Sequence, residues 1–113
     1  MIVFVSYARR DNAQSDLLRI SQQVSEFGAP YVDDLYEHGE TPRGRIVVAA
    51  LLAAGSFVAV LTPNYLRTPW TRSEFEVAAW RGIPILYLDP TSSQLCTRGP
   101  TGGHKDIRAT SGA

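Results

Sequence analysis

The stretch SFVAVLTPNYLRTPWTRSEFEVAAWRGIPILYLDP, residues 56–90, decides the fold. Its first part is an almost unbroken apolar run that predicts a strand over 56–62, buried on both faces of a parallel sheet. A helix is predicted over 70–81, where Gly82 is suited to end it, and a second buried strand over 83–88 follows. A strand, a crossover helix and a further strand of these lengths predict a parallel β-α-β unit.

The same alternation extends back to the start of the chain. Further strands are predicted over 2–7 and 30–33, and further helices over 12–27 and 42–54. The order β-α-β-α-β-α-β predicts an α/β fold, an open doubly wound parallel sheet of four to five strands with helices on both faces. In such sheets ligands bind beyond the carboxyl ends of the strands, so functional residues are expected there.

The two helices before residue 55 carry different patterns. The helix over 12–27 is expected to begin at Asp11 or Asn12, both good capping residues. Its buried face is predicted from apolar residues at helical spacing: Leu17, Ile20, Val24 and Phe27. The helix over 42–54 is almost wholly apolar in its second half and is expected to pack between other elements.

Composition narrows the classes of function. The 113 residues predict one domain with a modest core, and the formal net charge of zero argues against a nucleic-acid or anionic-membrane partner. The longest apolar run, residues 46–54, is far too short to span a membrane. A single cysteine, Cys96, excludes an internal disulfide and fits a reducing, cytoplasmic location. His38 and His104 have no partners at metal-ligand spacing, so no metal site is predicted.

The end of the chain differs from the rest. Residues 91–113, TSSQLCTRGPTGGHKDIRATSGA, are rich in Gly, Ser and Thr and show no periodicity. They are expected to form an irregular or disordered tail after a domain that spans residues 1–90.

The first candidate functional segment is FVSYARRD, residues 4–11. The end of the strand leaves Ser6 and Tyr7 at the rim of the sheet, and Arg9 lies at the start of the next helix, where anions are favoured. An arginine there could hold a pyrophosphate with two hydrogen bonds. The alternative is that Arg9 is a solvated loop residue and Tyr7 belongs to the core.

The second candidate segment is VDDLYEHGE, residues 32–40. Asp33 and Asp34 follow a strand and could bind ribose hydroxyls. The alternative is a polar, mobile loop, and mobility would itself suit a lid or an interaction loop.

The third candidate is Glu74, for which three interpretations compete. With Thr71 it matches a T-x-x-E capping box, although Thr68 followed by proline offers a rival helix start that would abolish the box. It could be a solvated charge, but it borders the apolar face of its helix, and Glu76 fits that role better. The third interpretation is a half-buried carboxylate beside Trp70 that acts on a cation or a developing oxocarbenium ion.

These segments together resemble the Toll/interleukin-1 receptor (TIR) domains. VFVSYARRD, residues 3–11, is similar to the first conserved box of that family. FVAVLTPNYLRTPWTRSEFEVAAWRGIPIL, residues 57–86, is similar to its third strand, S-P-x-Y/F-L turn, W-x-x-x-E helix and following strand. YVDDLYEHGE, residues 31–40, stands where the family has its second strand and BB loop. The resemblance covers about residues 2–90 and implies a flavodoxin-like fold.

Many TIR domains cleave NAD at the nicotinamide–ribose bond, and the glutamate of W-x-x-x-E is their catalytic residue. The resemblance therefore implies that Glu74 is catalytic, with NAD as substrate, no separate cofactor, and nicotinamide plus ADP-ribose or a cyclic product. It also implies a role in signalling or defence and self-assembly with other TIR domains. The candidate substrate-binding residues are Tyr7, Arg9, Trp70, Ser6 and Asp34.

Two other functions stay open. One is a non-enzymatic signalling adaptor that acts through TIR–TIR assembly. The other is a nucleoside or nucleotide N-glycosidase, because EFEVAAWRGIPI, residues 74–85, also resembles the nucleophile helix of nucleoside 2-deoxyribosyltransferases. The chain departs from the TIR pattern at Thr71, where the family often has cysteine, and the family's fifth strand and last helix have no evident counterpart in residues 91–113. A C-terminally truncated domain is expected on that ground.

Overall fold

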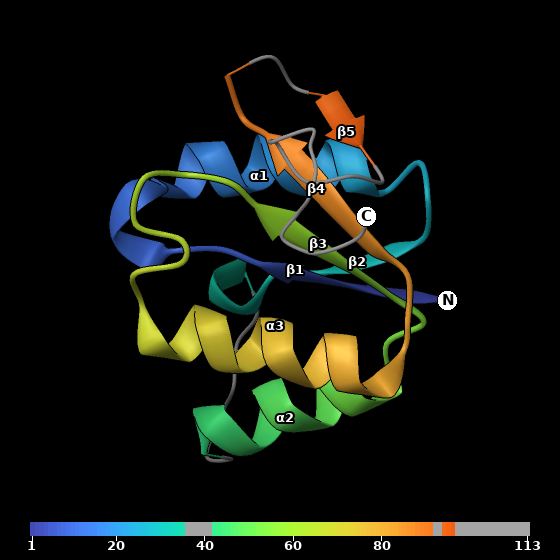
Figure 1. The fold of residues 1–113 in the computed structure, drawn as a ribbon. Coiled ribbons are helices and arrows are strands. Elements are labelled where there is room, and N and C mark those ends of the chain that lie inside the picture. The colour runs from blue at the N-terminus through green and yellow to red at the C-terminus, as the bar shows by residue number, and fades with distance from the viewer. Residues whose placement is uncertain (36–41, 92–93, 97–113) are drawn as a thin grey trace.

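Strands and helices alternate along the chain (Figure 1). The computed structural model describes residues 1–35, 42–91 and 94–96. The strands are β1 (Ile2–Ser6), β2 (Ala29–Tyr31), β3 (Ser56–Val60), β4 (Ile85–Asp89) and β5 (Gln94–Cys96). The helices are α1 (Gln14–Val24), α2 (Arg43–Ala53) and α3 (Pro69–Arg81). Short 3₁₀ turns follow β1 and β2, at Arg9–Asp11 and Asp33–Leu35.

The strands form one sheet in the order β2-β1-β3-β4-β5. Strands β1 to β4 are parallel, and the strand order reverses between β1 and β3. This order is that of flavodoxin-like folds, so the predicted fold class is confirmed. The carboxyl ends of β1, β2 and β3 therefore lie along one edge, and the segments that follow them meet there.

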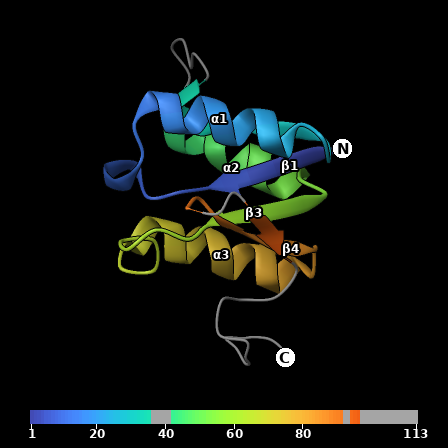
Figure 2. The same ribbon diagram turned by 90° about the horizontal axis from the view of Figure 1, so that it is seen from above.

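Each face of the sheet has its own hydrophobic core. Helix α1 covers one face through Leu17, Ile20 and Val24, which pack on inward-facing residues of β1, β3 and β4. Helices α2 and α3 cover the opposite face, where Val47 and Ala78 are buried. Figures 1 and 2 show α2 and α3 side by side on that face.

A row of aromatic rings crosses the face that α2 and α3 cover. The parallel register places Phe4 beside both Tyr31 and Phe57. The Phe4 ring stacks on those of Tyr31 and Phe57, with centroids 5.5 and 5.7 Å apart. Phe75 of α3 meets Phe57 edge-on at 6.1 Å, and its ring also approaches Tyr87 of β4. The row ties β2, β1, β3 and β4 to α3 through contacts that are favourable beyond simple burial.

Helix α1 is shorter than the predicted 12–27. It begins after Ala13, whose backbone N–H donates to the Asp16 carboxylate at 2.8 Å, so neither predicted capping residue caps it. It ends at Val24 because the backbone turns there, and the Phe27 N–H donates to the Val24 carbonyl. The prediction that Phe27 extends the buried face is wrong, since this residue lies beyond the helix and is 55% exposed.

Helix α2 is covered on one side only. Its Val47 and Leu51 are buried, but Val48 and Leu52 are 49% and 54% exposed. The expectation that α2 packs between other elements is therefore wrong. The apolar sequence of α2 leaves hydrophobic side chains at the surface.

The described part of the segment after Thr91, residues 94–96, is a strand. β5 pairs antiparallel with β4, with Leu88 opposite Leu95, which corrects the expectation that nothing after residue 91 is regular. Because β5 is antiparallel to β4, it does not test the expectation that the chain lacks the family's fifth strand and last helix, which stays a prediction. The rest of the predicted tail, residues 97–113, lies outside the described residues, so the domain limits 1–90 and 91–113 remain a prediction. Within the described ranges, no helix is long and apolar enough to cross a membrane.

Candidate active site

A cavity of about 490 Å³ lies at the carboxyl edge of the sheet, under the N-terminal half of α3. This volume is within the range of roughly 300–1,000 Å³ that is typical of small-molecule sites. The residues that line it are Phe4, Val5, Tyr7, Arg9, Asp33, Asp34, Arg43, Gly44, Val47, Thr68, Trp70, Thr71 and Glu74. Five of the six residues predicted for the site line this cavity, and Ser6 does not.

The start of α3 decides what Glu74 does. The helix begins at Pro69 with Thr68 as its N-cap, so the rival start is the one used and the Thr71–Glu74 capping box is absent. The Thr71 hydroxyl instead lies within hydrogen-bond distance of the backbone carbonyls of Tyr65 and Thr68, which share its single proton. Glu74 thus lies a full turn inside the helix, where its side chain is not needed for capping.

Glu74 is a buried carboxylate with a hydroxyl partner. Only 8% of the residue is exposed, which rules out the solvated interpretation. The Ser6 hydroxyl donates to Glu74 Oε1 at 2.7 Å, and the Tyr65 hydroxyl donates to Ser6 Oγ, also at 2.7 Å. Burial raises the pKa of Glu74 to about 7, against opposing hydrogen bonds from Ser6 and Trp70, and the negative charge of Asp33 raises it further. The carboxyl group therefore titrates near neutral pH.

This pKa predicts that Glu74→Gln stabilises the fold at alkaline pH. The pKa of Glu74 is about 7 in the folded state and 4.5 ordinarily. The stability that the protonated carboxyl group contributes is therefore fully present below pH 4.5 and is lost as the pH rises through 7. Glutamine carries no charge to bury, and it should raise the free energy of unfolding by roughly 3 kcal/mol at pH 8 and by almost nothing near pH 4.5. Urea unfolding of both proteins at the two pH values measures this. An equal difference at both values would show that the carboxyl group is not perturbed.

Trp70 lies on the first turn of α3 at the rim of the cavity. Its side chain is not part of the core, because the residue is 53% exposed. It lines the cavity together with Glu74, four residues later on the same helix face, and its indole N–H stabilises the Glu74 carboxylate. An open aromatic surface beside an acid can stack on a ligand ring.

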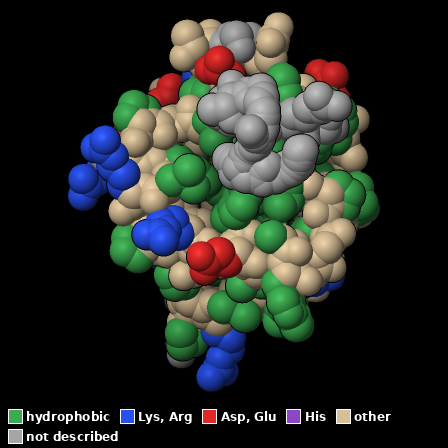
Figure 3. Space-filling model, in the orientation of Figure 1, with side chains coloured by type: hydrophobic (Ala, Val, Ile, Leu, Met, Phe, Trp, Pro, Cys, Tyr) green, Lys and Arg blue, Asp and Glu red, His purple; other side chains and the backbone are tan. Residues whose placement is uncertain are grey.

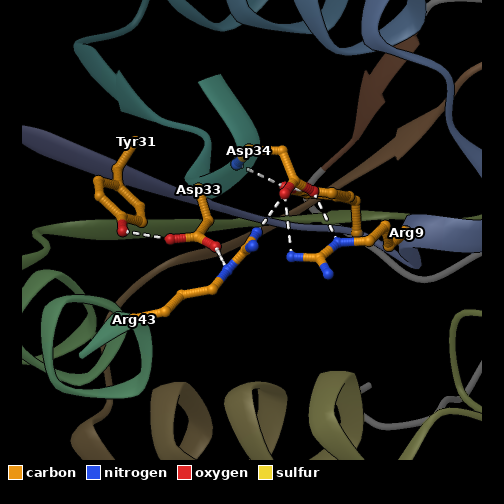
Figure 4. A network of polar contacts seen from close by, with 6 residues as sticks. Arg9, Tyr31, Asp33, Asp34 and Arg43 are labelled. Atoms are coloured by element: carbon orange, nitrogen blue, oxygen red, sulfur yellow. Dashed lines mark hydrogen bonds and ion pairs between the residues drawn. The ribbon is translucent and has the colours of Figure 1, made fainter. Parts of the chain in front are cut away.

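Opposite α3, two arginines and two aspartates form a connected network, in the order Arg9–Asp34–Arg43–Asp33 (Figure 4). Arg9 binds both oxygens of Asp34, with Nε–Oδ2 at 3.0 Å and Nη2–Oδ1 at 2.9 Å. Arg43, at the start of α2, is ion-paired with Asp33 and Asp34. The Tyr7 hydroxyl donates to Asp34 Oδ2 at 2.6 Å and accepts the Asp34 backbone N–H at 2.9 Å.

The network sets the charge state of its members. Desolvation alone would raise the pKa of Asp34, but hydrogen bonds from Tyr7, Arg43 and Arg9 outweigh it and lower this pKa to about 2. Burial, followed by the bond to Asp34, raises the pKa of Tyr7 well above its ordinary value. Arg9 was predicted to be either a phosphate-binding residue or a solvated loop residue. Its side chain is largely exposed but ion-paired with Asp34, so neither prediction describes it fully. A ligand phosphate would meet these arginines only by competing with the aspartates.

A further contact, between Asp11 and Asn64, joins the loops that follow β1 and β3. The backbone N–H and the side-chain amide of Asn64 donate to the two oxygens of Asp11 at 2.8 and 2.7 Å. Hydrogen bonding from Asn64 lowers the pKa of Asp11. Asp11, expected as a helix cap, instead ties the loop after β1 to the loop after β3.

Two residues of the site were not predicted from the sequence. Tyr65 lies in the turn after β3, where an aromatic residue in a loop at the carboxyl edge was the available signal. Arg43 lies in the first turn of a helix that follows the paired aspartates. Its proximity to Asp33 and Asp34 depends on how α2 docks, which local sequence does not reveal. The loop residues 36–41, with His38, lie outside the described residues.

Comparison with protein-family models agrees with the fold. No curated protein matches the chain at a significant level. A family model described as "TIR domain" matches residues 3–107, most of the chain. The match includes β1 with Ser6 and Tyr7, and α3 with Trp70 and Glu74. The chain belongs to the TIR domain family.

Proposed function

We propose that this TIR domain is an NAD⁺ glycohydrolase that cleaves the bond between nicotinamide and ribose. The observation that carries the proposal is Glu74, a buried carboxylate with a pKa of about 7 that opens on the 490 Å³ cavity beside Trp70. Groups whose pKa is shifted by burial and that line a cleft are favoured candidates for catalysis. A role in signalling or defence and a cytoplasmic location belong to the same proposal.

The proposed chemistry needs one anionic group. As the C1′–N bond breaks, its electron pair goes to the nicotinamide nitrogen, the ring becomes neutral and positive charge develops on ribose C1′ and the ring oxygen. Ionised Glu74 stabilises that charge, or attacks C1′ and is then displaced. A water molecule supplies the hydroxyl of ADP-ribose and releases a proton, and capture by a hydroxyl of the substrate gives a cyclic product instead.

The lining residues have matching roles in binding. Trp70 and Tyr7 offer aromatic surface for the rings of NAD. Arg9 would hold a phosphate, and Asp34 would accept a hydrogen bond from a ribose hydroxyl. In the unliganded network Arg9 and Asp34 satisfy each other, so substrate binding exchanges an internal ion pair for two external contacts.

Chromatography of NAD incubated with concentrated protein tests the proposal. Release of nicotinamide with ADP-ribose or a cyclic product supports it. Parallel incubations with nucleosides and with nucleotides that lack nicotinamide separate it from a general N-glycosidase. Turnover of those compounds with NAD left intact would replace the proposed substrate.

A non-enzymatic assembly role is the second candidate, and exposed apolar side chains on α2 and α3 favour it. Val48 and Leu52 on α2 are about half exposed, and Trp80 on α3 is 86% exposed. Hydrophobic side chains reach the surface over these two helices (Figure 3). Sedimentation over a range of concentrations tests whether Trp80→Ser weakens self-association. If the wild type assembles but does not cleave NAD at those concentrations, assembly would be its whole function.

A further inference from the structure

Two hydroxyl groups that do not line the cavity hold the Glu74 carboxylate. The Tyr65 hydroxyl donates to Ser6 Oγ and the Ser6 hydroxyl donates to Glu74 Oε1, each at 2.7 Å. Ser6 ends β1, Tyr65 lies in the turn after β3, and Glu74 is on α3. Three segments that are distant in sequence thus meet in one hydrogen-bonded chain.

The donors in this hydrogen-bonded chain follow from the number of protons on its hydroxyl groups. A tyrosine hydroxyl has one proton, and that of Tyr65 goes to Ser6 Oγ. The single proton of Ser6 is then left to point at Glu74, which accepts it through Oε1. Ser6 and Tyr65 are each 1% exposed, so bulk water does not compete for these bonds. The chain therefore fixes the orientation of the carboxyl group.

The partners of Glu74 are neutral, so no ion pair compensates the negative charge of its ionised form. An arginine at hydrogen-bond distance would hold the carboxylate equally well but would neutralise it and lower its pKa. The two arginines of the cavity are instead paired with Asp33 and Asp34. Among the residues that the structure describes, the charged and titratable groups around the cavity and the hydrogen-bonded chain are Tyr7, Arg9, Asp33, Asp34, Arg43, Tyr65 and Tyr87. Glu74 is thus oriented by hydroxyls while its charge stays available to a developing cation.

The backbone of Tyr65 is held to the same helix as Glu74. The buried Thr71 hydroxyl, on the first turn of α3, donates to the Tyr65 carbonyl. The turn that carries Tyr65 and the helix that carries Glu74 are thereby joined twice, once through the backbone and once through Ser6. The fold itself therefore fixes the position of the Glu74 carboxylate.

We propose that Tyr65 and Ser6 are positioning residues, which orient the Glu74 carboxylate for attack on, or stabilisation of, the cationic ribose carbon. The inference rests on the proposed NAD cleavage for its catalytic meaning. Neither residue contacts the substrate in this scheme. Their loss should therefore act on the carboxyl group and on the chemical step, and leave substrate binding nearly unchanged.

Carbon-13 NMR titration of the Glu74 carboxyl group tests the inference independently of activity. The signal is assigned by its loss in Glu74→Gln. Removing a donor to the ionised form raises a carboxyl pKa, so Ser6→Ala, which removes that donor, should raise the pKa of Glu74 by about 0.5–1. Tyr65→Phe removes the group that orients the Ser6 hydroxyl, and it should raise the pKa of Glu74 in the same direction by less. Ser73→Ala is the control, because it removes an exposed hydroxyl that lies next to Glu74 on α3 and does not line the cavity. Its Glu74 titration should match that of the wild type.

Kinetics on NAD provide the second readout. Tyr65→Phe should lower kcat by about fivefold to tenfold, as expected when one hydrogen bond between neutral groups is lost, with KM nearly unchanged. Unchanged titration and unchanged kcat in Tyr65→Phe would overturn the inference. A shifted titration in proteins that do not cleave NAD would leave the orienting role of the two hydroxyls standing and remove the proposed function. If Ser6→Ala fails to fold, Tyr65→Phe decides alone.

Discussion

Replacing Glu74 with glutamine is expected to lower the rate of NAD cleavage about a hundredfold or more while the protein remains folded. Glutamine keeps the shape of the side chain, and its Oε1 can still accept the Ser6 hydroxyl that Glu74 accepts at 2.7 Å. It removes the negative charge that faces ribose C1′ in the transition state. Loss of one preorganised electrostatic partner typically costs a factor of about 100–1,000 in kcat.

The matched control lies two residues further along the same helix. Glu76 is exposed and does not line the cavity, so Glu76→Gln removes an equal charge from α3 without touching the site. Its rate should stay close to that of the wild type. If Glu74→Gln cleaves NAD as fast as Glu76→Gln does, the carboxylate is not the catalytic group.

The second large effect concerns the sheet itself: Phe57→Ala should lower the free energy of unfolding by about 3–5 kcal/mol. Phe57 is fully buried in β3, with its ring between those of Phe4 and Phe75. Alanine would leave a cavity at the centre of the aromatic row. Domains of this size are stable by only about 5–15 kcal/mol, so much of the stability would be lost.

Chemical denaturation of Phe57→Ala measures this change. Trp80→Ala is the control, because it removes an even larger aromatic side chain that is 86% exposed, and it should change stability by no more than about 0.5 kcal/mol. A cost below about 1 kcal/mol for Phe57→Ala would contradict the packing described for the row.

Most of the fold could be predicted from local pattern. The apolar runs at β1 and β3 mark buried strands because parallel strands between two helical layers have no solvated face. The run at β4 also forms a strand, but only Leu88 in it is buried, so the prediction of a buried strand there is wrong. The spacing of Leu17, Ile20 and Val24 marks the buried face of α1 correctly. The pattern fails at Phe27, since hydrophobic spacing does not show where the backbone leaves the helix. β5 has only three residues, too few for a periodic signal.

The site was only partly predictable, and the reasons are physical. Glu74 and Trp70 could be singled out from their spacing, but two helix starts were open, and the choice between them depends on the Thr71 hydroxyl reaching the Tyr65 carbonyl. Tyr65 and Ser6 are 59 residues apart, and they meet because β1 and β3 are adjacent in the sheet. Long-range side-chain pairs of this kind depend on strand order and register, which local sequence does not specify.

The rate of nicotinamide release from NAD as a function of pH tests the central claim most directly, because it joins the reaction to the ionisation of Glu74. kcat/KM reports the ionisation of the free enzyme. With the Glu74 pKa at about 7 and its ionised form active, kcat/KM should be constant on the alkaline side and fall about tenfold per pH unit on the acid side of a midpoint near 7. A rate that does not change between about pH 5 and 9, or no release of nicotinamide at any pH, would contradict the account.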